Sequence, residues 1–290
     1  MELRVLRYFL GVVRCGTVTA AARALHITQP TLTRQLHELE EELGQRLFSQ
    51  VGRQLRLTPA GQRLRQRAEE MLALAQQTRS ELLSLGDELS GEVFIGAGES
   101  SAMREVAERI AAFRQRYPKI RFHLYSGNAE EILSRLDHGL LDFGVLIQPV
   151  DIARYESRPL AERATWGLIL RRDHPLASKR TICRADLPGL PLLCPRPMLA
   201  SAPVRNPCLD WLDGKTEALT IVGSYNLLYN AAQLVETGTV CAIGLDHLLG
   251  NRDLCFRPFS PAIESAVDIV WRKFRPFSNG AALFLESLQA

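Results

Sequence analysis

The feature that most constrains this chain lies near its N-terminus, where three short amphipathic segments follow one another with tight turns between them. Residues 3–13 place leucine and valine side chains at helical spacing, and Gly16 interrupts that pattern. Residues 20–25 are mostly alanine, which allows neighbouring helices to approach closely. Thr28 is an N-cap residue type, and Pro30 follows in the first turn, where a backbone N–H would lack a partner in any case. The sequence therefore predicts three packed helices, the last two joined by a tight turn.

The third predicted helix, which opens at Thr28, has one apolar and one polar face. Leucine recurs along one side, and the other side carries hydroxyl, amide, imidazole and guanidinium groups. Such a polar face is typical of a helix-turn-helix, in which glutamine can pair with an adenine edge and arginine with guanine O6 and N7. The alternative is a plain three-helix bundle whose polar face meets only solvent. The candidate DNA-binding residues here are Thr28, Gln29, Pro30, Thr31, Thr33, Arg34 and His37.

A short β-hairpin is predicted directly after the third helix. Leu47–Phe48 starts an extended segment, and polar and apolar residues alternate over 53–57 after Gly52. A hairpin in this place would form a wing beside the recognition helix. Its two arginines, Arg53 and Arg56, are candidates for contacts with DNA phosphates.

The distribution of charge favours nucleic acid as the partner of the N-terminal part. Residues 1–67 hold 11 Arg and 5 acidic residues, a net charge of +6. Residues 68–90 hold 1 Arg and 5 acidic residues, which gives −4, and the rest of the chain is close to neutral. A basic module attached to a neutral body is the pattern expected of a nucleic-acid-binding protein. An excess of this size also occurs in other domains, so charge alone leaves the question open.

A long helix is predicted from Thr58–Pro59 to about Leu85. Small or apolar residues recur along it at alternating spacings of four and three, the a/d pattern of a coiled coil. About 28 residues would make a rod of roughly 40 Å. We favour a dimerising helix, which would set two recognition helices about 34 Å apart on successive turns of the major groove. The alternative is that the residues of this seam pack against another part of the same chain. The candidate dimerisation residues are Leu64, Ala68, Met71, Ala75, Thr78 and Leu82.

Several motifs occur together in residues 3–61. They are Leu6–Arg7–Tyr8–Phe9, Ala20–Ala21–Ala22–Arg23–Ala24–Leu25–His26, Thr28–Gln29–Pro30–Thr31–Leu32–Thr33–Arg34–Gln35–Leu36, Leu39–Glu40–Glu41–Glu42–Leu43–Gly44, Leu47–Phe48 and Leu57–Thr58–Pro59–Ala60–Gly61. Together they resemble the N-terminal domain of LysR-type transcriptional regulators. Family members often have serine at Thr28 and Thr33, which keeps the hydroxyl group. They often have arginine at Gln50, so the resemblance implies one wing phosphate contact fewer here.

The resemblance implies a winged helix-turn-helix domain over residues 1–58, a linker and dimerisation helix over 59–88 and an effector-binding domain over 89–290. It implies a sequence-specific regulator of transcription that binds double-stranded DNA. It further implies a homodimer through the linker helix, a homotetramer built as a dimer of dimers, and RNA polymerase as a further partner.

The C-terminal two thirds alternate strand and helix patterns, which predicts an α/β fold. This layout resembles the family's effector domain, two lobes with a cleft between them, as in periplasmic solute-binding proteins. Lobe I would hold residues 91–160 and 266–290, and lobe II residues 161–265. The segments Asp173–His174–Pro175–Leu176–Ala177 and Val235–Glu236–Thr237–Gly238–Thr239–Val240 match recurring family segments.

Polar residues follow several of the predicted strands, where ligands bind in open α/β sheets. Hydroxyl groups and free N–H groups at a helix N-terminus suit an anion, so we expect a small organic anion as the effector, with no cofactor. The alternative for each residue is a plain helix cap. The candidate effector-binding residues, at positions that the resemblance also implies, are Ser100, Ser101, Asn128, Gln148, Ser201, Ser224, Tyr225 and Asn226.

No motif predicts catalysis, a metal site or a membrane span. Gly98-Glu99-Ser100-Ser101-Ala102 lacks the last glycine of a nucleophile elbow, so an enzyme acting through Ser100 is the weaker alternative. A reversible disulfide between Cys194 and Cys208 would make a redox-sensing regulator, against the simpler view that the 6 cysteines are free thiols. The absence of a secretory signal and of about 18 consecutive apolar residues predicts a cytoplasmic protein.

Overall fold

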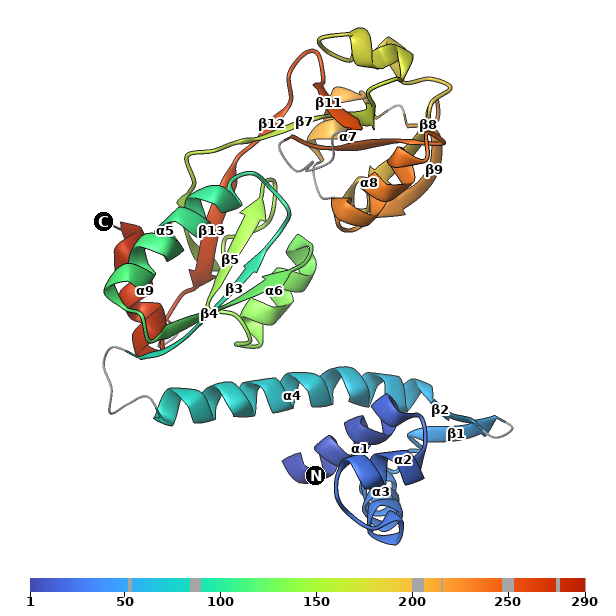
Figure 1. Cartoon of the computed structure of the whole chain (residues 1–290), viewed down its shortest axis with the longest axis vertical. Coiled ribbons are helices and arrows are strands. Elements are labelled where there is room, and N and C mark those ends of the chain that lie inside the picture. The colour runs from blue at the N-terminus through green and yellow to red at the C-terminus, as the bar shows by residue number, and fades with distance from the viewer. Residues whose placement is uncertain are drawn as a thin grey trace. The chain divides into compact units, whose positions relative to one another are not determined.

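The computed structural model describes residues 1–51, 54–83, 90–199, 206–214, 216–246, 253–274 and 277–289 (Figure 1). The chain divides into two compact units, Met1–Leu83 and Ser84–Ala290. Within the described residues, no single helix is long and apolar enough to cross a bilayer, although the sharply bent pair Leu3–Cys15 and Val18–Ala24 passes the length and composition test when taken together.

The N-terminal unit is a winged helix-turn-helix. Its core is formed by one apolar stripe from each of the first three helices, with Phe9 and Leu32 fully buried at its centre. The two wing strands pair antiparallel, with Phe48 opposite Leu57. Its elements are α1 (Leu3–Cys15), α2 (Val18–Ala24), α3 (Gln29–Leu43), β1 (Phe48–Val51), β2 (Gln54–Leu57) and α4 (Pro59–Leu83).

Threonine caps fix the start of three helices in this unit, α2, α3 and α4. Thr17 accepts a hydrogen bond from the backbone N–H of Ala20 at the start of α2. Thr28 does the same for Thr31 at the start of α3, and Thr58 for Gly61 at the start of α4. Between α2 and α3, His26 adopts a left-handed φ of 54°, which turns the chain sharply. Local sequence signals therefore determine the orientation of α3.

Lobe I of the C-terminal unit is a five-stranded sheet with helices on both faces (Figure 1). The strand order is β4-β3-β5-β13-β6; β3 runs parallel to β4 and β5, and β13 runs antiparallel to β5 and β6. Aromatic rings of Phe113, Phe143 and Phe284 meet edge to face under α5 and α9, while α6 packs on the other face. The elements are β3 (Gly91–Ala97), α5 (Met103–Arg116), β4 (Ile120–Ser126), α6 (Ala129–Asp137), β5 (Phe143–Ile147), β6 (Tyr155–Pro159), β13 (Val267–Arg272) and α9 (Asn279–Gln289).

Lobe II is a second mixed sheet, with the order β11-β7-β10-β8-β9 and β12 attached to β7. Strands β8, β9 and β10 run parallel, and β7 runs antiparallel to β10. Its elements are β7 (Ala164–Arg171), β8 (Pro191–Pro195), α7 (Pro207–Trp211), β9 (Thr220–Tyr225), α8 (Leu228–Glu236), β10 (Cys241–Leu245), β11 (Leu254–Pro258) and β12 (Glu264–Ser265), with short 3₁₀ turns at Pro175–Ser178, Arg184–Asp186 and Arg196–Leu199.

Two chain segments cross side by side between the lobes. Strand β7 pairs with β12, so that Glu264 lies opposite Thr165. The Leu160 N–H donates to the Val267 carbonyl at 2.8 Å, and the Trp166 indole N–H donates to Ser265 Oγ at 3.0 Å. The predicted fold class is therefore confirmed: an α-helical winged module, a long helix and a two-lobed α/β domain with a double crossover.

Candidate nucleic-acid interface and ligand pocket

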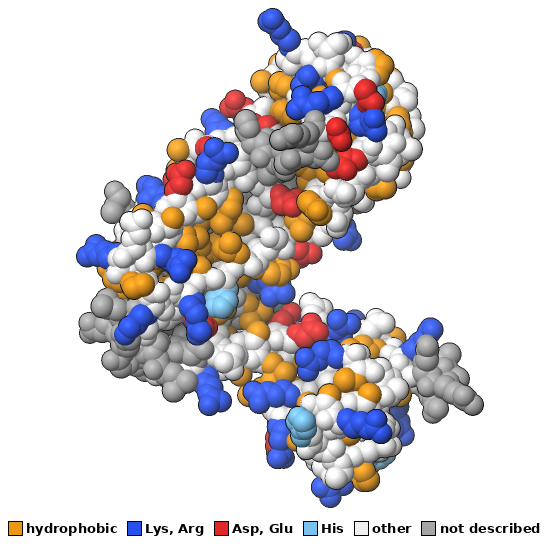
Figure 2. All heavy atoms as spheres, viewed as in Figure 1, with side chains coloured by type: hydrophobic (Ala, Val, Ile, Leu, Met, Phe, Trp, Pro, Cys, Tyr) orange, Lys and Arg blue, Asp and Glu red, His pale blue; other side chains and the backbone are white. Residues whose placement is uncertain are grey.

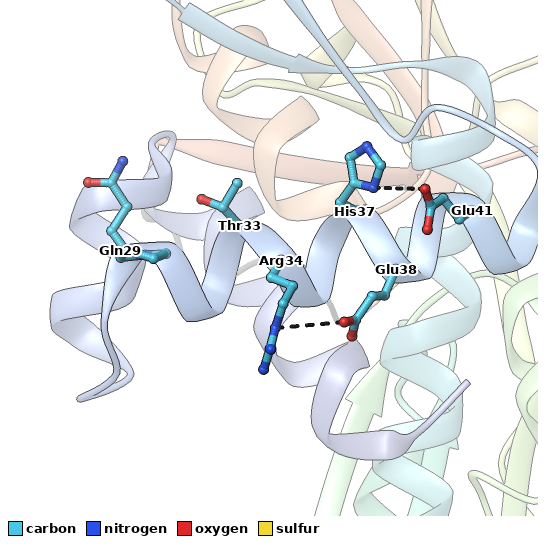
Figure 3. Close-up of a pocket in the computed structure, with 7 residues that line it drawn as sticks. Gln29, Thr33, Arg34, His37, Glu38 and Glu41 are labelled. Carbon is cyan, nitrogen blue, oxygen red and sulfur yellow. Dashed lines mark ion pairs between the residues drawn. The ribbon is translucent and has the colours of Figure 1, made fainter.

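The exposed face of α3 carries polar side chains along its whole length. Leu32, Leu36 and Leu39 point into the core. All seven residues predicted for DNA binding on this helix are exposed. Figure 3 labels four of them: Gln29, Thr33 and His37 follow one another along the helix, and Arg34 lies in the neighbouring row. This arrangement places amide, hydroxyl and guanidinium groups where base edges of a major groove would meet them.

The first turn of α3 is held by hydrogen bonds among its own polar side chains. Thr28 Oγ1 and Thr31 Oγ1 lie 2.8 Å apart. The Gln29 carbonyl oxygen accepts a hydrogen bond from the Thr19 hydroxyl of α2 at 3.0 Å. The amide group of Gln29 is thereby orientated before any ligand arrives, with its NH₂ donors left for recognition.

Two carboxylates of α3 pair with the basic side chains that were predicted to reach DNA (Figure 3). Arg34 Nε lies 3.7 Å from Glu38 Oε1, and His37 Nδ1 lies 3.2 Å from Glu41 Oε1. Both pairs are exposed, so each contributes little to stability. Their effect is on binding, because the carboxylates repel phosphates. The spacing of four residues within each pair is visible in the sequence, although these two ion pairs were not predicted from it.

Glu40 fastens the wing to the end of α3. Its carboxylate accepts hydrogen bonds from the backbone N–H groups of Leu47 and Phe48, at 2.7 and 3.3 Å, and from the Arg46 guanidinium at 2.8 Å. Burial by itself would raise the pKa of Glu40, but the two N–H groups and Arg46 outweigh burial, and its pKa lies below the ordinary value of 4.5. Of the two wing arginines, Arg56 is exposed on β2, and Arg53 lies outside the described residues.

Exposed basic side chains extend beyond α3. Figure 2 shows basic side chains over the visible face of the unit that carries α1 to α4, and all of them are Arg because this unit contains no Lys. Those that also form exposed ion pairs are Arg4, Arg34, Arg46, Arg65 and Arg67. The basic excess counted in the sequence is therefore on the surface, where it can attract a polyanion.

The predicted seam of α4 divides into two parts. Leu64 and Ala68 pack against the core of the N-terminal unit, and Ala68 is fully buried there. Met71, Thr78 and Leu82 are exposed, and Ala75 is half-buried. Leu74, which the heptad assignment did not include, is also exposed. Packing on the chain's own body therefore accounts for the first two positions, while the later apolar ones remain open to a partner.

A cavity of about 280 Å³ opens where lobe I meets lobe II. It follows the ends of β3 and β4 and the start of α5, and residues of α8 close its other side. The lining residues are Ala97, Gly98, Glu99, Ser100, Met103, Leu124, Tyr125, Ser126, Leu228 and Tyr229. A cavity of this size, mostly apolar with a few polar groups, suits a small organic molecule.

Two polar side chains dominate this pocket. Ser100 is 5% exposed, and its Oγ has no hydrogen-bond partner among the residues that the structure describes. A buried hydroxyl group without a partner is costly, and a ligand atom would satisfy it. Glu99 reaches across to lobe II, where its Oε2 accepts a hydrogen bond from the backbone N–H of Leu228. Sequence reasoning named Ser100 and missed Glu99 as well as the apolar lining.

The other candidate effector residues lie outside this lining. Asn128 caps α6 in a reciprocal capping box with Glu131. Gln148 is engaged by Asp268 and by the Val150 N–H. The Tyr225 hydroxyl donates to the Ile243 carbonyl at 2.5 Å, and burial raises the pKa of that hydroxyl.

Four candidates remain. Ser101 is partly exposed beside the buried Ser100, and Ser224 and Asn226 are exposed at the end of β9. Ser201 lies outside the described residues. Capping and internal hydrogen bonds thus explain several polar residues that strand ends alone could not distinguish from ligand contacts.

The two cysteines of the redox alternative are buried free thiols. Burial raises the pKa of Cys194 to about 11, and burial together with the nearby Cys194 raises that of Cys208 further. Thiol oxidation needs a thiolate, which such a pKa makes scarce. These sites therefore do not favour a redox sensor. Among the described residues, no group of His, Cys, Asp and Glu side chains could hold a metal ion.

A winged helix-turn-helix joined to a two-lobed ligand-binding domain defines a class of bacterial regulator. Two family models match the chain: "Bacterial regulatory helix-turn-helix protein, lysR family" over residues 3–62 and "LysR substrate binding domain" over residues 86–290. The second covers more than half of the chain. The chain therefore belongs to the LysR family of transcriptional regulators.

Relatives and solved structures agree with this assignment. The chain is 34% identical over 212 residues to the transcriptional activator IlvY of Salmonella typhimurium, covering 73% of this chain and 70% of IlvY. It is 32% identical over 187 residues to the regulator YtlI of Bacillus subtilis, covering 64% of this chain and 60% of YtlI. Its fold is similar to that of CbnR, a LysR family regulator, with a TM-score of 0.75 at 23% identity; the match covers 100% of this chain and 98% of CbnR. It is also similar to full-length CbnR in complex with its target DNA, with a TM-score of 0.73 at 22% identity; that match covers 100% of this chain and 99% of the other. These are regulators, and none points to an enzyme.

Proposed function

We propose that this protein is a sequence-specific, DNA-binding transcriptional regulator that is controlled by a small molecule bound between the lobes of its C-terminal domain. The observation that carries the proposal is the exposed face of α3, where Gln29, Thr33 and Arg34 form a polar surface over a buried leucine stripe. We assign DNA binding to residues 1–58, dimerisation to 59–88 and effector binding to 89–290.

The exposed side chains of α3 are proposed to recognise the bases, and the wing is proposed to contact the phosphates. Gln29 suits an adenine edge, Arg34 suits guanine, and the threonine methyl groups suit thymine. Pro30 and the hydroxyl groups of Thr28 and Thr31 lie at the start of the helix, next to the backbone of the groove. His37 and Arg56, both exposed, add basic contacts to phosphates. Arg53 is proposed to do the same from the wing turn.

The open part of the seam supports a homodimer through α4, and the resemblance to the family supports a tetramer of two such dimers. The side chains of Met71, Leu74 and Leu82 are 37%, 41% and 64% exposed, although they are large and apolar. Burying them against the same helix of a second chain would remove that exposure. A cytoplasmic location and contact with RNA polymerase would follow from binding to promoter DNA.

The dimer is tested by a charge placed in the seam. Met71→Glu combined with Leu82→Glu should weaken association by about tenfold or more, because a buried unpaired carboxylate is costly. Gln76→Glu, an exposed position on the same helix, is the matched control. Sedimentation across a concentration series reports the dissociation constant. Equal dissociation constants for both variants would locate the dimer interface elsewhere.

The effector should be a small molecule with an anionic group. Ser100 Oγ, which has no hydrogen-bond partner among the described residues, would receive that group at the start of α5, where the helix dipole favours a negative charge. Binding on the lobe I side and contact with α8 of lobe II would draw the lobes together. Closure would then alter how the dimers pack, and with that the spacing of the DNA half-sites.

The regulator is tested by selecting fragmented genomic DNA on the purified full-length protein and titrating the affinity of bound fragments against salt. Enriched fragments should share a dyad-symmetric site, and affinity should fall steeply as salt rises. Their genes would suggest the chemistry of the effector. Absence of binding at low salt would remove the DNA-binding assignment.

A further inference from the structure

Among the described residues that line the interlobe pocket, Glu99 is the one with a charged side chain. Among the described residues, no Lys, Arg or His forms an ion pair with it. Only one of its two oxygens is used by Leu228, because Oε2 accepts the bond from that backbone N–H. A carboxylate can accept several hydrogen bonds, so Glu99 keeps capacity for a donor inside the pocket. The simplest occupant of that position is a positively charged group.

The two helices that begin at this pocket lack a side-chain cap, unlike several other helices of the chain. Asn128 caps α6, and Thr17, Thr28 and Thr58 cap α2, α3 and α4. Neither α5 nor α8 receives a side-chain hydrogen bond from its own N-cap residue, Ala102 or Leu227. The start of α8 is satisfied by Glu99. The start of α5 has the buried, unpartnered hydroxyl group of Ser100 beside it.

The pocket therefore offers an anion position and a cation position on adjacent residues. Glu99 and Ser100 are consecutive residues and both line the pocket, so one small ligand that carries both charges can contact the two of them. An α-amino acid carries its carboxylate and its ammonium group on a single carbon. Ala97, Met103 and Leu124 supply apolar contacts for a side chain, and a cavity of about 280 Å³ limits the ligand to a small one.

We propose that the effector is a small α-amino acid, with its carboxylate on Ser100 and the start of α5 and its ammonium group on Glu99. The proposal rests on the regulatory function proposed above and narrows the expected organic anion to a zwitterion. An anion without the ammonium group would bring a second negative charge beside Glu99 and bind more weakly. A ligand held by both groups would link Ser100 to the residue that bridges to α8.

The test uses calorimetric titration of the full-length protein with each proteinogenic amino acid. For every amino acid that binds, its 2-oxo acid and its N-acetyl derivative are titrated as reference compounds, because both keep the carboxylate and lack the ammonium charge. We expect at least one amino acid to bind about tenfold or more tightly than both reference compounds, the scale of a charge-assisted hydrogen bond. Failure of every amino acid to bind would overturn the proposal, and so would equal or tighter binding of the 2-oxo acids.

Three variants separate ligand recognition from helix capping. Glu99→Gln keeps an oxygen that can accept the Leu228 N–H and removes the charge, so the preference for the amino acid should shrink to about threefold or less. Glu130→Gln, an exposed residue in the first turn of α6, is the control and should keep the preference. Ser100→Ala should weaken the amino acid and its 2-oxo acid alike. An unchanged preference in Glu99→Gln would leave Glu99 as a cap of α8 alone and overturn its role as a ligand contact.

DNA binding is measured on the same preparations. Specific DNA binding without amino-acid binding would sink this inference and leave the regulator intact. Amino-acid binding without DNA binding would contradict the proposed regulatory function and leave the assignment of the ligand intact.

Discussion

At the scale of single residues, the exposed groups of α3 are arranged by spacing that the sequence displays. Leu32, Leu36 and Leu39 are buried as predicted, so the residues between them must face solvent. The sequence could not show that Glu99 reaches the Leu228 N–H, because that contact joins positions 129 residues apart. Local periodicity predicts which face of a helix is buried, whereas a contact across a cleft depends on how two lobes meet.

Arg34 is expected to be the main base-reading residue. Replacing it with alanine should lower affinity for the preferred site by about 1–3 kcal/mol and relax specificity at one base pair, because a bidentate contact to guanine is lost. Arg114→Ala removes the same charge from an exposed position in the other unit and serves as the control. Both are measured by titrating the preferred site and its single-base variants. A uniform loss on every sequence would make Arg34 a backbone contact.

Glu40 should make the stability of the N-terminal unit depend on pH. Its folded-state pKa is lowered below 4.5, so its contribution is fully present above the unfolded-state pKa and is lost as pH falls through the folded value. Glu40→Gln should destabilise this unit by about 1–3 kcal/mol at neutral pH, because the Leu47 and Phe48 N–H groups and Arg46 lose a charged acceptor. Urea unfolding from neutral to acidic pH should show the difference from the unsubstituted protein narrowing. A constant difference would contradict this role.

At the scale of elements, strong caps and long periodic segments were predictable and short edge strands were not. Helices α3 and α4 begin where Thr28 and Thr58 predict. The strands β6 and β11 were not expected, because each lies at the edge of its sheet and is defined by pairing with a strand that is distant in the sequence. The same limit applies to α4, whose heptad pattern cannot reveal that Ala68 is covered by the chain's own core.

The junction between α4 and the wing should tolerate no added side chain at Gly61. A Cβ atom there would lie 2.1 Å from the Leu47 carbonyl oxygen, which is backbone and cannot rotate away. Gly61→Ala should therefore lower the free energy of unfolding by about 1–3 kcal/mol. Gly280→Ala in α9 is the matched control, since its Cβ would meet only ordinary contacts and alanine favours a helix. Thermal unfolding of both variants measures the difference in stability between them. Equal stability of the two variants would show that a Cβ atom at residue 61 is accommodated without a clash.

At the scale of the whole molecule, the two functions belong to separate compact units. The family resemblance read from residues 3–61 extended to the entire chain, and the family models confirm it in both units. What the sequence could not supply was the lining of the pocket, because it combines the ends of β3 and β4 with the start of α8. Such a surface exists only after both lobes have folded.

Effector and DNA should influence each other equally. If the effector changes DNA affinity by a given factor, commonly about 5- to 150-fold in coupled systems, the specific DNA must change effector affinity by that same factor. Calorimetric titration of the effector with and without the DNA site measures one direction, and DNA titration with and without the effector measures the other. Ser100→Ala should remove the effect of the effector while leaving binding of DNA alone intact. Independent affinities would contradict control through this pocket.

The carboxylates of Glu38 and Glu41 carry a consequence for the speed of regulation. A genome presents a vast excess of wrong sequences, and each landing on one delays arrival at the promoter. If α3 reads DNA as proposed, its two negative charges should shorten those visits, since on a wrong sequence no specific contact offsets their repulsion from the phosphates. Variants without these charges should bind non-specific DNA with higher affinity and should therefore reach their promoters more slowly. The helix thus gives up some attraction and gains a faster search.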